Sequence, residues 1–211
     1  LPHGEAHLIS KKIRSNSVLI DLSADFRIDN KTIFEKWYKL PHQATKEQKK
    51  SIYGLSEINR SLIKKSNFIA CPGCYPTSIL LPLLPLVKNK LINTNSIKAD
   101  SKSGYSGAGK KTTDKKLYPN INENISIYGV GQHRHMPEID QELSKSSKKK
   151  IKISFTPHLI PTFRGILSTI YLDLPKGIKI KKVKDCLLNF YKKEKFVNVV
   201  NSKEMINTNL V

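Results

Sequence analysis

The sequence predicts an α/β protein, and two changes of pattern along the chain carry this prediction. In the first third, short apolar runs rich in β-branched residues alternate with helical segments, which is typical of buried parallel strands. Beyond Pro72, apolar and polar residues alternate instead, as in strands with one covered face. We therefore expect residues 1–72 to end an α/β domain and residues 73–211 to form an α+β domain with a mostly antiparallel sheet.

The first part predicts strand, helix, helix and strand in that order. Residues 18–22 form an apolar run that breaks into a Ser-Ala-Asp turn, which indicates a buried strand and the loop at its carboxyl end. Residues 32–40 are typical of a short helix. Ser56 is a favoured helix N-cap for residues 57–64, and residues 67–70 return as a second buried strand.

The second part begins with an apolar segment and continues with strands. Pro82 and Pro85 predict that the helix in this segment is short or bent, because proline cannot donate a helical hydrogen bond. The pattern predicts further strands and one amphipathic helix. The predicted strands are residues 96–102, 151–158, 165–174 and 196–200, and the predicted helix is residues 181–193.

The net charge is +20, which raises the question of nucleic-acid binding. Only five of the 37 basic residues are arginine, and the lysines are spread along the chain. Recognition surfaces favour the planar fork of arginine, so we interpret the charge as a solvated surface. We expect neither a nucleic-acid partner nor a membrane partner.

Composition also bears on the cellular compartment. No apolar run approaches the roughly 20 residues that cross a bilayer, and three cysteines are too few for a secreted disulfide framework. The sequence therefore predicts a cytoplasmic protein with reduced thiols. It begins at Leu1 without methionine, and we expect it to be a fragment that lacks both ends of a longer protein.

The stretch ACPGCYPTSIL places Cys74 two residues before a proline, which is tolerated in the first turn of a helix. A helix N-terminus stabilises an anion, so the position favours a thiolate nucleophile. Cys71 follows a buried strand and is expected to be packed there. A zinc site, a redox dithiol and two structural cysteines are the alternatives; zinc would require a second cysteine pair, and Cys186 stands alone.

Three polar clusters follow the cysteines. SKSGYSGAGKKTT is a glycine-rich loop whose amides could hold a phosphate or a cofactor, although such loops are common. In GVGQHRHMPEI, His133 and His135 point to one side if the stretch is extended, and either imidazole could act as an acid or base near neutral pH. FTPHLIPTFRGIL carries Arg164, a residue type suited to clamping an anion.

Taken together, the motifs CPGCYPT, SGYSGAG, QHRHMPEI and TPHLIPTFRGIL, preceded by LPHG, DLSADFR and YGLSE, resemble the N-acetyl-gamma-glutamyl-phosphate reductases. This family is part of the semialdehyde dehydrogenase superfamily. The resemblance covers nearly the whole chain. It implies the C-terminal part of a Rossmann-type NADP-binding domain, followed by a catalytic and dimerisation domain like that of glyceraldehyde-3-phosphate dehydrogenase.

The resemblance also implies a reaction. The family reduces an acyl phosphate with NADPH in arginine biosynthesis, through a thioester on the residue that matches Cys74. It implies His135 as the acid/base group, with His133 as the alternative that the sequence does not separate from it. The implied substrate-binding residues are Arg164, His158 and Arg134, and no metal is implied.

The resemblance implies NADP(H) as the cofactor and a homo-oligomer as the assembly. The family's glycine-rich fingerprint would precede Leu1, so we expect this polypeptide to bind NADPH poorly. The implied cofactor-binding residues are His3, Gly4, Ser23, Asp25, Ser103, Gly104, Ser106 and Gly107. The alternative substrates are aspartyl phosphate and a carrier-bound aminoadipyl phosphate, and the alternative class is a basic nucleic-acid or scaffold protein.

Overall fold

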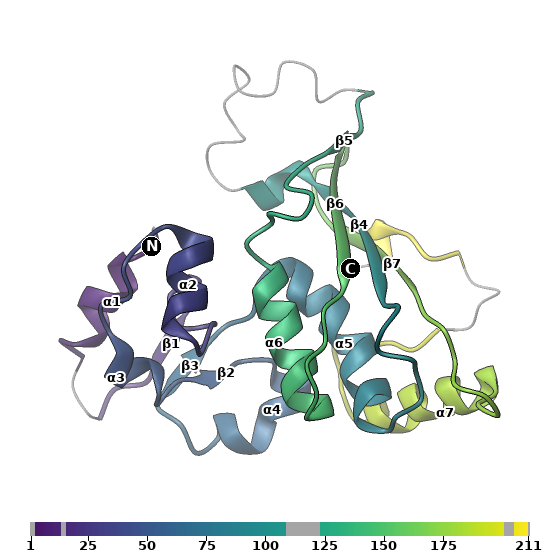
Figure 1. Ribbon diagram of the computed structural model, residues 1–211, viewed down its shortest axis with the longest axis horizontal. Helices are drawn as coiled ribbons and strands as arrows, with labels where there is room; N and C mark the ends of the chain where they lie inside the picture. The colour runs from purple at the N-terminus through teal and green to yellow at the C-terminus, as the bar shows by residue number, and fades with distance from the viewer. Residues whose placement is uncertain (1–2, 14–15, 109–122, 201–204, 211) are drawn as a thin grey trace. The chain divides into compact units, whose positions relative to one another are not determined.

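The protein is described by a computed structural model that covers residues 3–13, 16–108, 123–200 and 205–210 (Figure 1). The chain divides into two compact units, Leu1–Thr77 and Ser78–Val211. Each unit combines a sheet with helices, so the predicted α/β class is confirmed. Helix α5 (Cys74–Lys88) crosses the division. The domain boundary expected after residue 72 stays a prediction.

The first unit contains a parallel sheet of short strands. Its order is β1 (Leu19–Asp21), β3 (Phe68–Ala70) and β2 (Ile52–Tyr53), and both pairings are parallel. The two strands predicted from apolar runs are β1 and β3. The two-residue strand β2 is too short to show a pattern and was not predicted.

Four helices belong to the first unit: α1 (Glu5–Ser10), α2 (Lys31–Tyr38), α3 (Thr45–Gln48) and α4 (Ser56–Ile63). The Asn30 side chain caps α2 by accepting a hydrogen bond from the Ile33 amide at 3.1 Å. The prediction that Ser56 caps α4 is wrong. The helix begins at Ser56 itself, because Leu55 takes the extended cap position and makes no side-chain cap.

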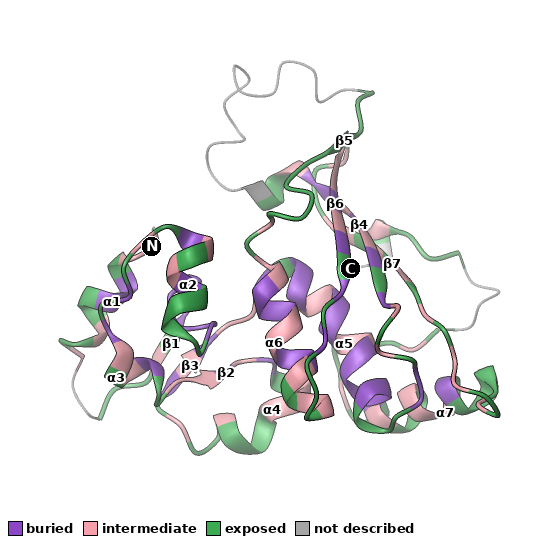
Figure 2. Ribbon diagram, viewed as in Figure 1, coloured by how far each residue is buried: buried purple, intermediate pink, exposed green. Residues whose placement is uncertain are grey.

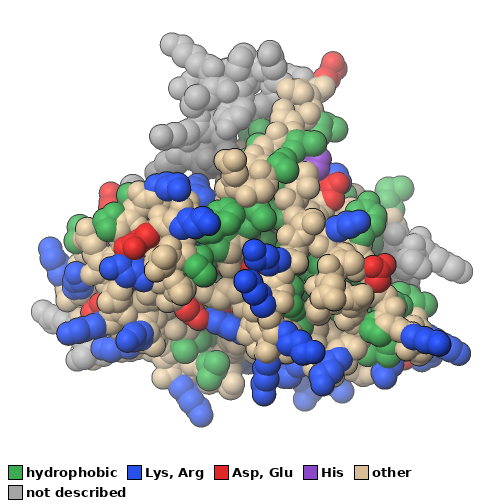
Figure 3. Space-filling model, viewed as in Figure 1, with side chains coloured by type: hydrophobic (Ala, Val, Ile, Leu, Met, Phe, Trp, Pro, Cys, Tyr) green, Lys and Arg blue, Asp and Glu red, His purple; other side chains and the backbone are tan. Residues whose placement is uncertain are grey.

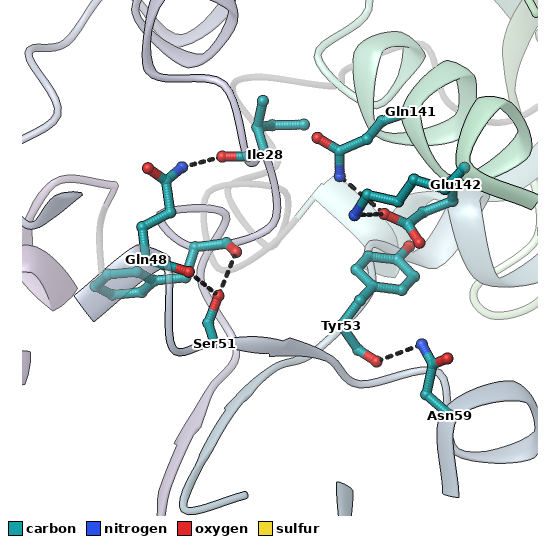
Figure 4. A network of polar contacts seen from close by, with 9 residues as sticks. Ile28, Gln48, Ser51, Tyr53, Asn59, Gln141 and Glu142 are labelled. Atoms are coloured by element: carbon teal, nitrogen blue, oxygen red, sulfur yellow. Dashed lines mark hydrogen bonds and ion pairs between the residues drawn. The ribbon is translucent and has the colours of Figure 1, made fainter. Parts of the chain in front are cut away.

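Side-chain hydrogen bonds to backbone carbonyls fix the loops of the first unit (Figure 4). The Gln48 amide donates to the Ile28 carbonyl, and the Ser51 hydroxyl donates to the Gln48 carbonyl. The side-chain amide of Asn59 donates to the Tyr53 carbonyl at 2.8 Å and holds α4 against β2. These bonds provide partners for carbonyls in a loop, at the end of α3 and in β2.

The second unit contains a mixed sheet in the order β5 (Ser126–Ile127), β6 (Ser154–Ile160), β4 (Lys98–Gly104) and β7 (Ile166–Tyr171). Strands β5 and β6 pair antiparallel, as do β4 and β7, whereas β4 and β6 run parallel. The predicted mostly antiparallel sheet is therefore confirmed, with a parallel pair at its centre. The chain leaves β6, crosses over the end of β4 and returns as β7.

Of the two alternatives predicted for the helix after the cysteines, short or bent, the short one is wrong, and the bend stays a prediction. Helix α5 continues through Pro82 and Pro85 to Lys88, and its side chains are largely buried (Figure 2). Pro85 has no N–H, so the Leu81 carbonyl loses its helical donor. The Tyr191 hydroxyl supplies a replacement by donating to that carbonyl at 2.5 Å. Tyr191 is the last residue of α7 (Ile180–Tyr191), so α7 stabilises the proline-containing turn of α5.

Replacing Tyr191 with phenylalanine is expected to lower the free energy of unfolding by about 1 to 3 kcal/mol. The ring is kept, and the Leu81 carbonyl loses the hydroxyl that satisfies it. Urea unfolding of the full protein that carries this chain measures the effect. Tyr171→Phe is the matched control, because Tyr171 is an exposed tyrosine of β7. An equal loss in both variants would contradict this account of the helix.

Helix α6 (Met136–Ser147) was not predicted, and the strand predicted at residues 196–200 is wrong. Three signals could have identified α6: a proline near its start, Glu138 in its first turn, and the apolar residues Ile139 and Leu143 four positions apart. Residues 196–200 alternate as a strand would, but none of them pairs with the described sheet and Phe196 is 93% exposed. Strand propensity produces a strand only where a neighbouring edge is available.

Replacing Asp140 of α6 with asparagine is expected to raise the free energy of unfolding at pH 7 by about 1 to 2 kcal/mol, allowing for partial solvent exposure. Burial raises the pKa of Asp140 to about 6, although its carboxylate accepts a hydrogen bond from the Ile153 amide at 3.1 Å. The folded state therefore holds a proton that the unfolded chain releases above its ordinary pKa of 3.8. Stability from this group is lost as the pH rises from about 4 through 6. Urea unfolding should show no gain near pH 4, and an equal gain at both pH values would contradict the prediction.

Lysine and arginine side chains lie scattered over the face of the molecule that Figure 3 shows. They do not gather into one stripe on that face, in keeping with a solvated surface. Within the described residues, no helix combines the length and the apolar character that crossing a membrane requires.

Candidate active site

Cys74 is the first residue of α5, as the sequence predicted, and it is exposed. A residue in the first turn of α5 fixes the backbone just before Cys74. The Gly73 carbonyl accepts hydrogen bonds from the amide and from the hydroxyl of Thr77, each at 2.9 Å. The thiol is therefore accessible at a helix N-terminus, where amide donors and the helix dipole favour a negative charge.

Cys71 has a different environment. It follows β3 and is half-buried, and its amide donates to the Asp21 carbonyl at 2.8 Å. Burial raises the pKa of the Cys71 thiol, and the neighbouring Arg27 partly opposes this effect. A thiol with a raised pKa is a poor nucleophile at neutral pH. The contrast between the two cysteines favours Cys74 as the reactive residue and Cys71 as its packed neighbour.

His133 and His135 lie in the turn before α6, so the stretch is not extended and the condition set for a shared side does not apply. The two imidazoles are nevertheless adjacent, with ring centroids 4.9 Å apart and an edge-to-face arrangement. The His135 amide donates to Nδ1 of His133 at 3.2 Å, and the Met136 amide donates to the His133 carbonyl at 2.9 Å. The ring and the backbone of His133 therefore both accept hydrogen bonds from the start of α6.

The surroundings of His133 keep its imidazole uncharged. Burial, together with the positive charge of the neighbouring Arg134, lowers the pKa of His133 to about 4. His133 is therefore neutral at physiological pH. Because Nδ1 accepts the His135 amide, we assign the proton of His133 to Nε2. Arg134 is exposed and shares the turn with both imidazoles.

One face of the sheet in the second unit carries α5. Ser101 of β4 points toward it and is linked to α5 by hydroxyl groups: Ser101 Oγ lies 2.7 Å from Ser168 Oγ, which lies 2.8 Å from Ser78 Oγ. His133 lies on the same face, because its ring contacts Phe155, the neighbour of Ala99 across the β4–β6 pair. The sheet thus presents α5 and the His133 turn on one side.

His158 lies on the opposite face of this sheet. Its Nδ1 atom is 3.2 Å from a carboxylate oxygen of Asp100, and the Lys102 amine is 2.6 Å from the same oxygen. Asp100 and Lys102 alternate along β4 with the buried Ser101, so they face away from α5. The structure therefore separates His158 from the His133 turn and groups it with a partly exposed ion pair.

Arg164 lies in the crossover between β6 and β7 and is exposed. Its guanidinium lies 5.2 Å from the centre of the Phe163 ring, and the Tyr105 ring packs on Phe163 with centroids 5.3 Å apart. Aromatic contacts of this kind favour a cation and restrict its motion. The guanidinium of Arg164 is therefore exposed at a position that the aromatic contacts restrict.

Backbone hydrogen bonds hold this crossover on the end of β4. The amides of Gly104, Tyr105 and Ser106 donate to the carbonyls of Gly165, Thr162 and Phe163 at 2.9, 3.0 and 3.0 Å. A Cβ atom on Gly104 would lie 2.7 Å from the Phe163 oxygen and 2.9 Å from the Arg164 nitrogen. These three amides therefore position the crossover and do not cradle a phosphate. Residues 109–113 of the glycine-rich loop lie outside the described residues, so the interpretation that the wider loop holds a phosphate or a cofactor stays a prediction.

The cofactor residues predicted in the first unit are also paired with one another. The Asp25 carboxylate accepts hydrogen bonds from the Gly4 amide at 2.8 and 2.9 Å and from the Ala6 amide at 3.1 Å, which caps α1. Ser23 Oγ donates to Asp21 and accepts from the Asp25 amide. The His3 ring packs edge-on against Tyr38.

These contacts bear on how a dinucleotide could bind. Asp25 is fully buried, and the groups just described already have partners within the chain. Of the other predicted residues, Ser103 donates to the Gly104 carbonyl, and Gly107 is exposed. The predicted residues of the first unit could border a dinucleotide site. By themselves they do not supply the hydrogen-bond donors that would hold a dinucleotide, because the donors just described bond within the chain. Among these residues no group of three or more His, Cys, Asp or Glu side chains is arranged to hold a metal ion.

Comparison with known proteins gives the family. The model of the semialdehyde dehydrogenase dimerisation domain matches residues 74–211. The chain belongs to the semialdehyde dehydrogenase family. The matched region of the chain begins at Cys74, the first residue of α5.

The semialdehyde dehydrogenase chain is similar to several curated proteins. It is 47% identical over 201 residues to the probable N-acetyl-gamma-glutamyl-phosphate reductase, chloroplastic, of Arabidopsis thaliana, covering 95% of this chain and 50% of that protein. It is 45% identical over 212 residues to the N-acetyl-gamma-glutamyl-phosphate reductase of Alkaliphilus metalliredigens, covering 100% of this chain and 61% of that protein. The chain thus spans about half to three fifths of the length of these relatives.

Solved structures support the fold of this semialdehyde dehydrogenase. The aspartate semialdehyde dehydrogenase II of Vibrio cholerae, complexed with ASA, aligns with a TM-score of 0.60 and 16% identity over 92% of this chain and 57% of that one. The enzyme from Francisella tularensis aligns with a TM-score of 0.53 and 16% identity over 69% of this chain and 54% of that one. At this identity the likeness concerns the fold alone.

Arg27 is the residue of the site that sequence reasoning missed. It is buried, and it donates to the carbonyls of Cys71 and Leu22, next to the cysteine loop. A signal was available in the sequence, because an arginine directly after the buried-strand loop of DLSADFR stands out in a chain whose basic residues are mostly lysine.

Proposed function

We propose that the protein carrying this chain reduces N-acetyl-gamma-glutamyl phosphate to N-acetylglutamate 5-semialdehyde and phosphate, in arginine biosynthesis. The observation that carries this proposal is the exposed Cys74 at the first residue of α5, in a chain 45–47% identical to proteins named for this substrate. The reaction class is an acyl-phosphate reduction that forms an aldehyde.

Cys74 acts as the nucleophile. Its thiolate attacks the acyl carbon of the acyl phosphate, a bond to sulfur forms, and the carbon–oxygen bond to phosphate breaks, which leaves a thioester and inorganic phosphate. The amide-rich N-terminus of α5 stabilises the oxygen that becomes negative during this attack. Cys71 is unsuited to the role, because its thiol is half-buried with a raised pKa.

His135 acts as the acid/base group at the substrate oxygen. It adjoins the start of α6, and the neighbouring His133 holds its backbone amide. His133 is neutral above pH 5 because its pKa is about 4, so it cannot donate a proton as imidazolium at working pH. This contrast favours His135 over His133.

Arg164 binds an anionic group of the substrate, either the phosphate or the carboxylate of the glutamyl moiety. The stacked Phe163 ring and the backbone bonds to β4 support this role, because they fix the position of the cation. Arg134 is a second candidate for the same kind of contact, since it is exposed beside the two histidines. His158 is the weakest of the three substrate-binding candidates, because it faces away from α5.

The net reaction requires a hydride donor, for which we propose NADPH. Most of its binding groups would come from parts of the protein other than the described residues, which use their own donors internally. The matched dimerisation domain supports assembly as a homo-oligomer. A cytoplasmic location stays a prediction, since the Arabidopsis relative is named chloroplastic.

The test is NADP reduction by the full protein with N-acetylglutamate semialdehyde and phosphate. We expect phosphate-dependent turnover that vanishes in Cys74→Ser and survives in Cys71→Ser, the matched control. Activity that survives in Cys74→Ser would contradict the proposal.

The same assay separates the alternative substrates. Turnover with aspartate semialdehyde and none with N-acetylglutamate semialdehyde would keep the chemistry and change the substrate. The likeness to aspartate semialdehyde dehydrogenases does not favour that outcome, because it rests on the fold at 16% identity. Aminoadipate semialdehyde on its carrier is the third substrate to assay.

A further inference from the structure

Arg27 is a buried cation, and two of its nitrogen atoms donate to backbone carbonyls. It is 8% exposed, its Nε atom donates to the Cys71 carbonyl at 2.6 Å, and its Nη2 atom donates to the Leu22 carbonyl at 2.9 Å. Charge-assisted hydrogen bonds of this length are stronger than ordinary backbone bonds. Both bonds are partly buried.

The two carbonyls belong to the residues that follow neighbouring strands. Leu22 follows β1 and Cys71 follows β3, and the strands pair in parallel up to Asp21 and Ala70. The Cys71 amide extends the ladder by one bond to the Asp21 carbonyl. Arg27 continues this connection past the end of the ladder. It joins the segment that follows β1 to the segment that follows β3, beyond their last backbone hydrogen bond.

The segment between Arg27 and the nucleophile has little freedom. Pro72 has a fixed φ angle and restricts Cys71 before it to extended conformations. At the other end, the Gly73 carbonyl is held by the amide and hydroxyl of Thr77. Holding the Cys71 carbonyl therefore determines where Cys74 begins α5.

We propose that Arg27 is the positioning residue for Cys74, holding the Cys71–Gly73 segment so that the thiolate stands at the N-terminus of α5. This inference rests on the proposed function, because it assumes that Cys74 is the nucleophile. The positive charge contributes in the same sense, since Arg27 acts against the raised pKa of the nearby Cys71 thiol. Lysine would keep a charge but could not bridge the two carbonyls in a planar fork.

The test uses the full protein and two readouts, the alkylation rate of Cys74 and the steady-state kinetics. Iodoacetamide labelling is followed over pH 6 to 10 by mass spectrometry of the peptide that contains Cys74. In Arg27→Gln we expect labelling at pH 7 to slow about tenfold, with the midpoint about one pH unit higher. We expect kcat to fall at least as much, with a smaller change in KM.

Arg27→Lys should fall between the wild type and Arg27→Gln, and it serves as the second variant if the glutamine variant does not fold. Arg60→Gln is the matched control, because Arg60 is an exposed arginine on α4 of the same unit. We expect its labelling rate to match the wild type.

A purely structural role would lower the melting temperature in both Arg27 variants and leave Cys74 labelling of the folded protein unchanged, and that result would overturn the inference. The labelling needs no substrate, so failure of the proposed function is distinguishable. A wild-type protein without turnover on any of the three aldehydes, whose Cys74 labelling still depends on Arg27, would refute the function and keep the positioning role.

Discussion

Replacing His135 with glutamine is expected to lower kcat of the full protein by a factor of about 10² to 10⁴, the usual contribution of a general acid or base. The side chain adjoins α6 in a turn that His133 fixes through the His135 amide, so the backbone of the turn is kept in the variant. Steady-state kinetics over pH 5 to 9 measure the change. In the variant, the dependence of kcat on pH that comes from titration of the acid/base group should disappear together with most of the activity.

His133→Asn is the informative comparison for this result. Asparagine can still accept the amide two residues ahead, as the imidazole Nδ1 does at 3.2 Å. Since the pKa of His133 is about 4, its loss should remove no titration between pH 5 and 9. A smaller loss of activity with the pH profile retained is expected. Loss of the neutral-pH limb in His133→Asn, and its survival in His135→Gln, would reverse the assignment.

Replacing Gly104 with alanine is expected to raise KM for the acyl phosphate about tenfold or more and to lower the free energy of unfolding by about 1 to 3 kcal/mol. The new Cβ would lie within 2.9 Å of backbone atoms of Thr162, Phe163 and Arg164, none of which can rotate away. The crossover must therefore move, and Arg164 moves with it. Kinetics and thermal unfolding of the full protein measure the two effects.

Gly107→Ala is the matched control for this glycine. Its Cβ would lie 3.1 Å from the Ser103 hydroxyl, the end of a side chain that can adjust. The variant should therefore change KM and stability much less than Gly104→Ala. Equal effects in the two variants, or a normal KM in Gly104→Ala, would contradict the positioning of Arg164 by β4.

The sequence was sufficient for those parts of the fold that leave a local pattern. The strands β1 and β3 are apolar runs, and α7 is an amphipathic helix, and all three were predicted within a few residues. Helix α5 was predicted to be short or bent, and its full length was missed because the hydroxyl of Tyr191, 110 positions from Leu81 along the chain, bonds the carbonyl that Pro85 leaves without a helical donor. No local rule identifies such a partner.

The candidate site shows the same division. Cys74 at a helix start follows from the proline two residues after it, and the sequence was enough for this. The lowered pKa of His133 depends on its burial, which sequence does not give, and the choice between His133 and His135 stays a prediction. The glycine-rich loop was interpreted as a phosphate cradle because its composition allows it. Its amides bond to the crossover between β6 and β7, whose position over β4 depends on strand order.

The most direct test of the central claim is a count of NADPH formed when the full protein meets N-acetylglutamate semialdehyde and NADP without phosphate. If Cys74 forms the thioester, oxidation of the aldehyde stops after one NADPH per active site, because no phosphate is present to release the acyl group. Mass spectrometry should then find an N-acetylglutamyl group on Cys74, and adding phosphate should restore turnover. Phosphate-dependent turnover with no such burst, or an acyl group on another residue, would contradict the account.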